Sequence, residues 1–299
     1  MKHRQDILFK NSLGLLSWAF IAVLVAMILS LLHMSGLAWE KIGFSFFTTS
    51  HWNPVKHQYG VAAFAWATLV TSLLALLIST PLSLAVAVSV TELMKKRAGR
   101  VFGFFVDMLA AIPSVVYGLW GIFVLVPLMR TQVQPWLFEN LGWIGIFSEV
   151  PYGVGILTAS IVLAIMILPT MSSLLREVFQ TIPLTQKEAA LGLGATKTEM
   201  IYLSVVKSSK SSIVAAMVLG LARALGETMA VTMVIGNRND WMKSIFSPAQ
   251  TMASLIANEY VEATHDLHLS ALALVGVTLL MISSVIQLVF RAIYARGRK

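Results

Sequence analysis

The sequence predicts an all-α membrane protein, a bundle of six transmembrane helices. Hydrophobic residues make up 57% of the 299-residue chain and charged residues only 12%, which is too little charge to cover a water-soluble globule of this size. Six apolar segments reach the roughly 20 residues that a spanning helix needs. The roughly ten-residue alternating segments of an outer-membrane barrel are absent from the sequence, whereas helices satisfy their own backbone hydrogen bonds in lipid.

The six predicted spans and the connections between them divide the chain. No A-x-A cleavage site follows the first apolar run, which is too long for the core of a signal peptide, so we expect a retained helix. Pro81, Pro113 and Pro169 fall inside spans and predict kinks. We expect an N-terminal helix with the first external loop at 1–60 and a helical core at 61–299, with a long cytoplasmic loop at 175–211. The predicted spans are 13–34, 61–90, 101–129, 153–174, 212–236 and 269–290.

Lysine and arginine are distributed unevenly between the two sides of this bundle. With a cytoplasmic amino terminus, sixteen of them fall inside, five fall outside, and Arg223 lies within a span. Positive residues accumulate on the cytoplasmic side, so we expect both termini inside, in a multi-pass protein of the inner membrane. The net charge of +8 then reflects topology and contact with membrane lipid, and nucleic acid is not an expected partner.

Metal and cofactor chemistry finds little support in the sequence. The chain has no cysteine, which excludes disulfides and cysteine-ligated clusters. Two histidine pairs, His51 with His57 and His265 with His268, lie in polar loops without further ligands at metal-site spacing. We therefore expect no metal and no cofactor. The five tryptophans of the external loops suit either an interfacial belt or a docking surface; they are Trp39, Trp52, Trp136, Trp143 and Trp241.

The cytoplasmic loop predicts two short helices joined by a turn. Thr185 with Glu188 and Thr196 with Glu199 have the spacing of capping boxes, and the glycines between them, Gly192 and Gly194, can end the first helix in a left-handed conformation. Such a loop can lie on the membrane as a connector. It can also insert into a groove of another protein, which its small residues Ala189 and Ala190 favour. The segment GLGATKT lacks the glycines of a phosphate-binding loop, so the chain itself should not bind ATP.

Four motifs resemble a known family. EAALGLG, from Glu188 to Gly194, resembles the EAA-x-x-x-G signature of the permease subunits of ABC-type importers, although Ser204 to Lys207 stand where that signature ends in I-x-L-P. AAIPSVVYGLWGIFVLVP at 110–127, RALGETMAV at 223–231 and the external Trp-Asn-Pro at 52–54 with Tyr59 and Gly60 resemble the C-type permeases of phosphate-specific systems. Their A-type partners are similar.

The resemblance implies a fold, partners and a set of docking residues. It implies a type I ABC importer permease that pairs with an A-type permease, a cytoplasmic ATPase dimer and a soluble phosphate-binding protein outside. Glu188, Ala189, Ala190 and Gly194 would dock into the ATPase. The subunit itself would be no enzyme, because ATP hydrolysis belongs to the partners.

Two charges inside a span, Arg223 and Glu227, form the candidate substrate pathway. An arginine at the centre of a membrane helix costs about 2.5–3.5 kcal/mol on insertion scales, and such residues face the bundle interior or a wet cavity. A spacing of four would place both side chains on one face of a helix. The guanidinium matches phosphate oxygens with two parallel hydrogen bonds, while Glu227 would orient it or weaken anion binding. The alternative is a structural intrahelical ion pair.

Asp107, near the inner end of its predicted span, suits either a transport role or a side chain that reaches the cytoplasmic interface. Together with the family resemblance, these features predict a subunit that forms half of the translocation path of an ATP-driven phosphate importer. A permease for sulfate or molybdate is the nearest alternative, since arginine suits any oxyanion. A channel or secondary transporter would leave the EAA-like loop unexplained. An intramembrane enzyme lacks H-E-x-x-H and any Ser-His or paired-Asp arrangement in the spans.

Overall fold

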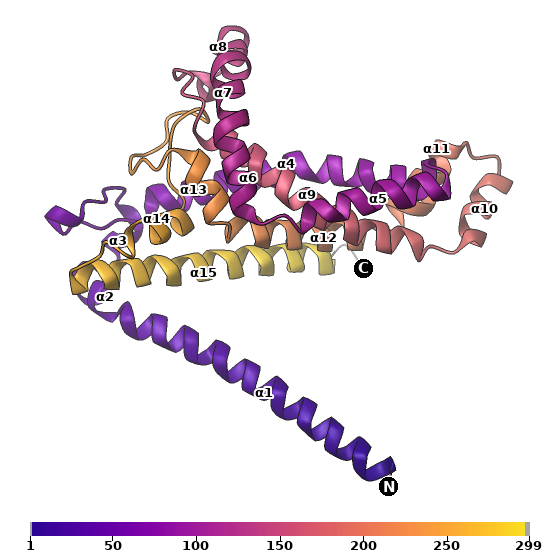
Figure 1. Cartoon of the computed structure of the whole chain (residues 1–299), viewed down its shortest axis with the longest axis horizontal. Coiled ribbons are helices and arrows are strands. Elements are labelled where there is room, and N and C mark those ends of the chain that lie inside the picture. Colours follow the sequence, from indigo (N-terminus) through magenta and orange to yellow (C-terminus); the bar gives the residue numbers. More distant parts are fainter. Residues whose placement is uncertain (1, 297–299) are drawn as a thin grey trace.

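The computed structural model describes residues 2–296, with side chains described for residues 9–290 and 292, and it confirms the predicted helical membrane fold (Figure 1). Among the described residues, five helical segments are long and apolar enough to span a membrane, or six when a bent helix pair is counted as one span. The five are Phe9–Ile42, Ala62–Leu93, Ser114–Leu141, Ile156–Gln180 and Asp266–Phe290.

Two long helices, α4 (Ala62–Val88) and α9 (Ile156–Gln180), form the centre of the molecule. They run side by side because small residues face each other across the contact, which lets the two backbones approach closely. Both helices continue through a proline, Pro81 in α4 and Pro169 in α9. The buried small residues are Ala67, Ala75, Ser79 and Ser83 on α4, and Ala159, Ser160, Ala164 and Ser172 on α9.

The third span differs from the prediction of one helix at 101–129. Helix α5 (Lys96–Ala110) ends before Pro113, and a new helix begins at Ser114. Proline has no N–H and disfavours helical geometry at the residue before it, so the kink predicted at Pro113 is a complete break. The spanning helix after it is built from α6 (Ser114–Trp120), η3 (Gly121–Leu125), α7 (Val126–Leu128), η4 (Met129–Val133) and α8 (Gln134–Leu141).

The fifth predicted span, 212–236, is also broken. Helix α12 (Lys210–Leu225) ends at Gly226, and α13 (Met229–Ile235) begins three residues later. A further bend of 63° separates α12 from the helical segment Lys197–Lys207 that precedes it. The structure therefore replaces one straight helix by a chain of shorter pieces. Gly236, with φ of +95°, ends α13 in the left-handed conformation that glycine tolerates.

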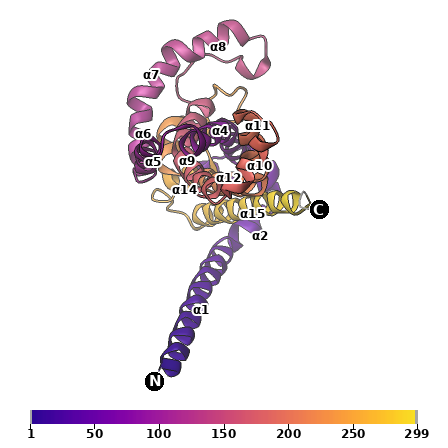
Figure 2. The same cartoon turned by 90° about the vertical axis from the view of Figure 1, so that its right-hand side faces the viewer.

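The two ends of the bundle carry different elements (Figure 1). In Figure 1 the chain ends lie toward the side of α10 and α11, opposite α2, α3 and α14, and α6, α7 and α8 rise away from the bundle. In both views α1 (Lys2–Met34) diverges from α15 (Asp266–Arg296) toward its amino end (Figure 2). The remaining elements are α2 (Gly36–Ile42), α3 (Ser45–Thr48), η1 (Pro54–Lys56), η2 (Ser89–Leu93), η5 (Gly145–Phe147), α10 (Leu184–Gly192), α11 (Lys197–Met200), η6 (Ile201–Lys207) and α14 (Met252–Glu259).

Candidate functional site

The breaks in the third and fifth predicted spans lie on helices that pack against each other. Helix α6 approaches α13 closely because Gly118 has no side chain: a methyl group there would lie 3.1 Å from the Cα atom of Ala230. Gly121, one turn later, also allows close packing, because a methyl group there would lie 2.7 Å from a side-chain atom of Val234. The segments 110–127 and 223–231, which were singled out in the sequence, therefore meet in the fold.

Arg223 occupies the last turn of α12, directly before the break, and is half-buried. Its Nη1 donates a 2.7 Å hydrogen bond to the hydroxyl of Thr170, the residue after Pro169 on α9. Tyr117 on α6 lies within electrostatic range of the same guanidinium, and its hydroxyl donates a 2.6 Å bond to the Leu109 carbonyl across the α5–α6 break. Three helices thus contribute to the surroundings of one arginine.

Glu227 does not share a helical face with Arg223, so that prediction was wrong. Glu227 lies in the break, and its carboxylate accepts a 3.3 Å hydrogen bond from the backbone N–H of Ala230 in the first turn of α13. Among the salt bridges of the described residues, none joins it to Arg223. The structural ion pair considered as an alternative is therefore also absent from this part of the chain.

The broken helix supplies its own electrostatic stabilisation for the two charges. Carbonyl groups at a helix C-terminus favour a cation, and N–H groups at a helix N-terminus favour an anion. Arg223 sits at the end of α12 and Glu227 at the start of α13, so each charge meets the favourable helix end. Of the five N–H groups of a guanidinium, only one of Arg223's has a hydrogen-bond partner among the described residues.

The cytoplasmic loop forms the predicted pair of short helices. In α10, Glu188 and Ala189 are exposed and Ala190 is half-buried, while Gly194 makes the turn with φ of +89°. Thr196 and Glu199 form the predicted capping box, and hydrogen bonds from the Thr196 backbone and side chain lower the pKa of the Glu199 carboxyl. The box predicted at Thr185 is wrong, because α10 begins one residue earlier, after Pro183, and Thr185 lies inside its first turn.

The outer face of α10 is more apolar than the motif alone indicated. Leu184, Glu188 and Leu191 are exposed at helical spacing, and Leu193 in the turn is 90% exposed. Exposed apolar side chains beside a recognised docking motif suit burial in a groove of another protein. Sequence reasoning missed these leucines, although their spacing of seven around Glu188 was a usable signal.

Asp107 pairs with Arg176 and thereby fixes α5 against α9. Arg176, which was counted with the cytoplasmic loop, lies in α9 and is buried beneath α5. Gly103 makes room for it, since a methyl group there would lie 2.2 Å from its Nη1 atom. Asp107 is therefore a residue that holds two helices together.

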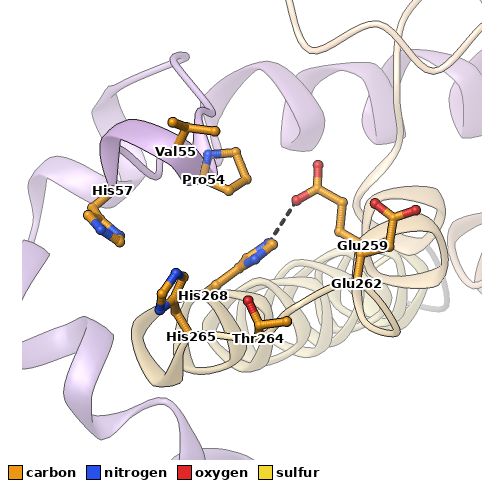
Figure 3. A pocket seen from close by; sticks show the side chains of 8 residues that line it. All are labelled: Pro54, Val55, His57, Glu259, Glu262, Thr264, His265 and His268. Carbon is orange, nitrogen blue, oxygen red and sulfur yellow. Dashed lines mark hydrogen bonds and ion pairs between the residues drawn. The ribbon is translucent and has the colours of Figure 1, made fainter.

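The external Trp-Asn-Pro motif belongs to a buried polar cluster. The carboxylate of Glu259 accepts a 2.7 Å hydrogen bond from Trp52 Nε1 and lies 2.9 Å from His268 Nε2, while Tyr59 stacks on His268. Trp52 is buried, so it is no part of an interfacial belt, whereas the other four tryptophans are exposed. His57 and His265 face each other at the mouth of the adjoining pocket (Figure 3). No metal-binding group of three ligands occurs in the described residues.

The fold and the site described so far suit a permease, and comparisons with known proteins define the class to which the chain belongs. Residues 79–299 match the family described as binding-protein-dependent transport system inner membrane component, and the chain belongs to it. It is a multi-pass permease subunit of an ABC importer and works with other components of such a system.

The relatives in this family include phosphate permeases. The chain is 41% identical to the phosphate transport system permease protein PstC of Pasteurella multocida, over 99% of this chain and 94% of the relative. It is 42% identical to PstC of Haemophilus influenzae over 95% and 91%, and 34% identical to the probable PstC of Methanocaldococcus jannaschii over 90% and 87%.

Two solved ABC transporters share the fold. The inward-facing MetNI methionine transporter matches with a TM-score of 0.61 at 15% identity, covering 82% of this chain and 99% of that one. A bacterial alginate transporter matches with a TM-score of 0.61 at 17% identity, covering 94% and 96%. These likenesses confirm the type I importer architecture.

Proposed function

We propose that this chain forms one half of the translocation path of an ATP-driven phosphate importer. The observation that carries the proposal is the guanidinium of Arg223, held by Thr170 at the end of α12 with most of its donors free. The names of the relatives at about 41% identity support phosphate as the transported anion. Tetrahedral oxyanions accept paired hydrogen bonds from arginine, which suits this site.

We propose the partners that the family resemblance implies, and the exposed outer face of α10 supports the docking of an ATPase. A second, A-type permease completes the path. A cytoplasmic ATPase dimer receives α10 through Glu188, Ala189, Ala190 and the turn at Gly194, and a soluble phosphate-binding protein docks on the external side. Residues 1–60 form the first helix and the external loop that leads into the core at 61–299.

Both termini are cytoplasmic in this proposal. The placement of the chain ends toward the side of α10 and α11 supports it (Figure 1), as does the sixteen-to-five distribution of Lys and Arg, even though Arg176 and Arg130 lie inside helices.

Substitution of Arg223 by lysine tests the role of its planar fork. Arg223→Lys keeps the charge but loses paired hydrogen bonding, so phosphate uptake should fall by about tenfold or more, since a hydrogen bond to a charged group contributes ~1.5–3 kcal/mol. Uptake of labelled phosphate is measured at matched membrane levels, with copurification of the ATPase as the assembly check. The control is Arg100→Lys, an exposed arginine of α5. Normal uptake by Arg223→Lys and by Arg223→Met would refute a substrate role.

A further inference from the structure

An ion pair joins the cytoplasmic helix α10 to the inner end of the α4 span. Lys187 Nζ lies 2.7 Å from Glu92 Oε1, and the two side chains are only 15% and 7% exposed. The residues are 95 positions apart in the chain. The pair connects two different elements of the fold, and within the described residues it is the one salt bridge made by α10.

Lys187 faces the permease, whereas the exposed residues of α10 face away from it. Glu188 and Leu191 are exposed on the outer side, and Lys187 and Ala190, three residues apart, are half-buried on the inner side. The other polar contacts of α10, between Gln186 and Ser204 at 3.4 Å, reach only η6 in the same loop. Lys187 is therefore the charged link from the docking helix to the membrane domain.

Glu92 belongs to η2, which continues α4 and packs tightly on α5. A methyl group on Gly99 of α5 would lie 2.6 Å from the Val90 carbonyl oxygen, so the two backbones are in direct contact. At its other end α5 is bonded to α6 through Leu109 and Tyr117, and Tyr117 is near Arg223. A displacement of η2 can therefore pass through α5 and the Leu109–Tyr117 hydrogen bond to a residue within electrostatic range of Arg223.

We propose that the Lys187–Glu92 ion pair is the strut through which movement of α10 reaches η2 and α5. The proposal rests on the proposed docking of α10 into the ATPase. A buried ion pair contributes little net stability compared with apolar residues of the same size, so stability alone does not account for two buried charges here. A rigid charged contact instead makes η2 follow α10 when the ATPase moves it.

A double substitution separates a strut from a structural pair. Single changes, Lys187→Met or Glu92→Gln, leave a buried charge without its partner and can reduce folding. The neutral double variant, Lys187→Met with Glu92→Gln, removes both charges and should reach the membrane and retain its ATPase. Without the strut, phosphate uptake and the stimulation of ATP hydrolysis by loaded binding protein should both fall by about 2- to 30-fold, the range of measured coupling changes, because both need movement to pass between α10 and the membrane domain. Basal ATP hydrolysis should stay unchanged.

Charge exchange provides the rescue. The swap Lys187→Glu with Glu92→Lys restores an ion pair and should recover part of the lost uptake, while Lys197→Met, an exposed lysine of the same loop, serves as the matched control with normal uptake. Normal uptake in the neutral double variant, or a swap variant no better than it, would overturn the strut. Absence of ATP-driven phosphate uptake by the unaltered complex would instead contradict the proposed function itself.

Discussion

Arg223 Nη1 donates a 2.7 Å hydrogen bond to Thr170 Oγ1 and so ties the end of α12 to α9 directly after Pro169. The bond engages Nη1 of the guanidinium and leaves its other N–H groups without a hydrogen-bond partner among the described residues. Thr170 is therefore a positioning residue for the proposed anion site, and it was not recognised from the sequence.

Removal of the Thr170 hydroxyl should weaken transport without loss of the permease. Thr170→Val keeps the shape of the side chain, and phosphate uptake should fall by about 2- to 12-fold, since a net hydrogen bond contributes ~0.5–1.5 kcal/mol. Thr170→Ser keeps the hydroxyl and should retain near-normal uptake. Initial uptake rates over a range of phosphate concentrations measure both. Equal losses in the two variants would show that the hydroxyl is not what matters.

Glu259 should be the main stabilising residue of the external cluster. A single carboxylate oxygen, Glu259 Oε2, meets both Trp52 and His268, and Glu259→Gln removes the negative charge that strengthens both contacts. We expect a loss of about 1–3 kcal/mol in the free energy of unfolding, measured by thermal unfolding of the purified protein in detergent. Glu262→Gln, an exposed glutamate three residues farther along the chain, is the matched control and should leave the transition in place.

The sequence predicted the helical spans well because apolar length is a local property. It placed α4, α9 and α15 within a few residues, but it did not predict that Pro113 and Gly226 end helices, because the apolar runs resume beyond both positions. The choice between a bend and a break depends on packing, here of Gly118 against Ala230.

The candidate site could be predicted only in part, because the sequence shows local charge and spacing but not contacts between distant segments. Arg223, Glu227 and the motif at Glu188 to Gly194 stood out by charge or spacing. The partners Thr170, Glu92 and Arg176 come from segments far away in the chain, and no periodicity links them to the residues that they contact. The sequence left Trp52 open between an interfacial belt and a docking surface, and tertiary contacts bury it instead.

Substitutions at the left-handed turn of Gly194 should lower phosphate uptake according to the backbone strain that each introduces. A branched residue at φ of +89° is strained, so Gly194→Val should lower uptake strongly while the permease remains in the membrane. Asparagine tolerates positive φ better, and Gly194→Asn should retain more activity. Gly192→Ala, where φ is not positive and nothing lies within 4 Å, should be harmless. Uptake and ATPase copurification are measured for all three. Equal activity in Gly194→Val and Gly192→Ala would contradict the role of this turn.

Tyr59 should titrate above the ordinary tyrosine pKa. Burial raises the pKa of its phenol, and the nearby Glu259 carboxylate raises it further. The folded state therefore holds this proton more tightly than the unfolded state, and the resulting stabilisation is lost as the pH rises through the folded pKa. The ultraviolet titration difference between the protein and Tyr59→Phe reports this group. A pKa at or below the ordinary value of about 10 would contradict the described burial.

Reconstituted transport tests the central claim most directly. The permease pair and ATPase are placed in liposomes with ATP inside and phosphate-loaded binding protein outside, and labelled phosphate is followed into the lumen. The account predicts accumulation that requires ATP and the binding protein, is not reduced by excess sulfate or molybdate, and is strongly reduced by Arg223→Lys. Accumulation without ATP would indicate a channel or secondary transporter, and a preference for sulfate or molybdate would contradict the assignment of phosphate.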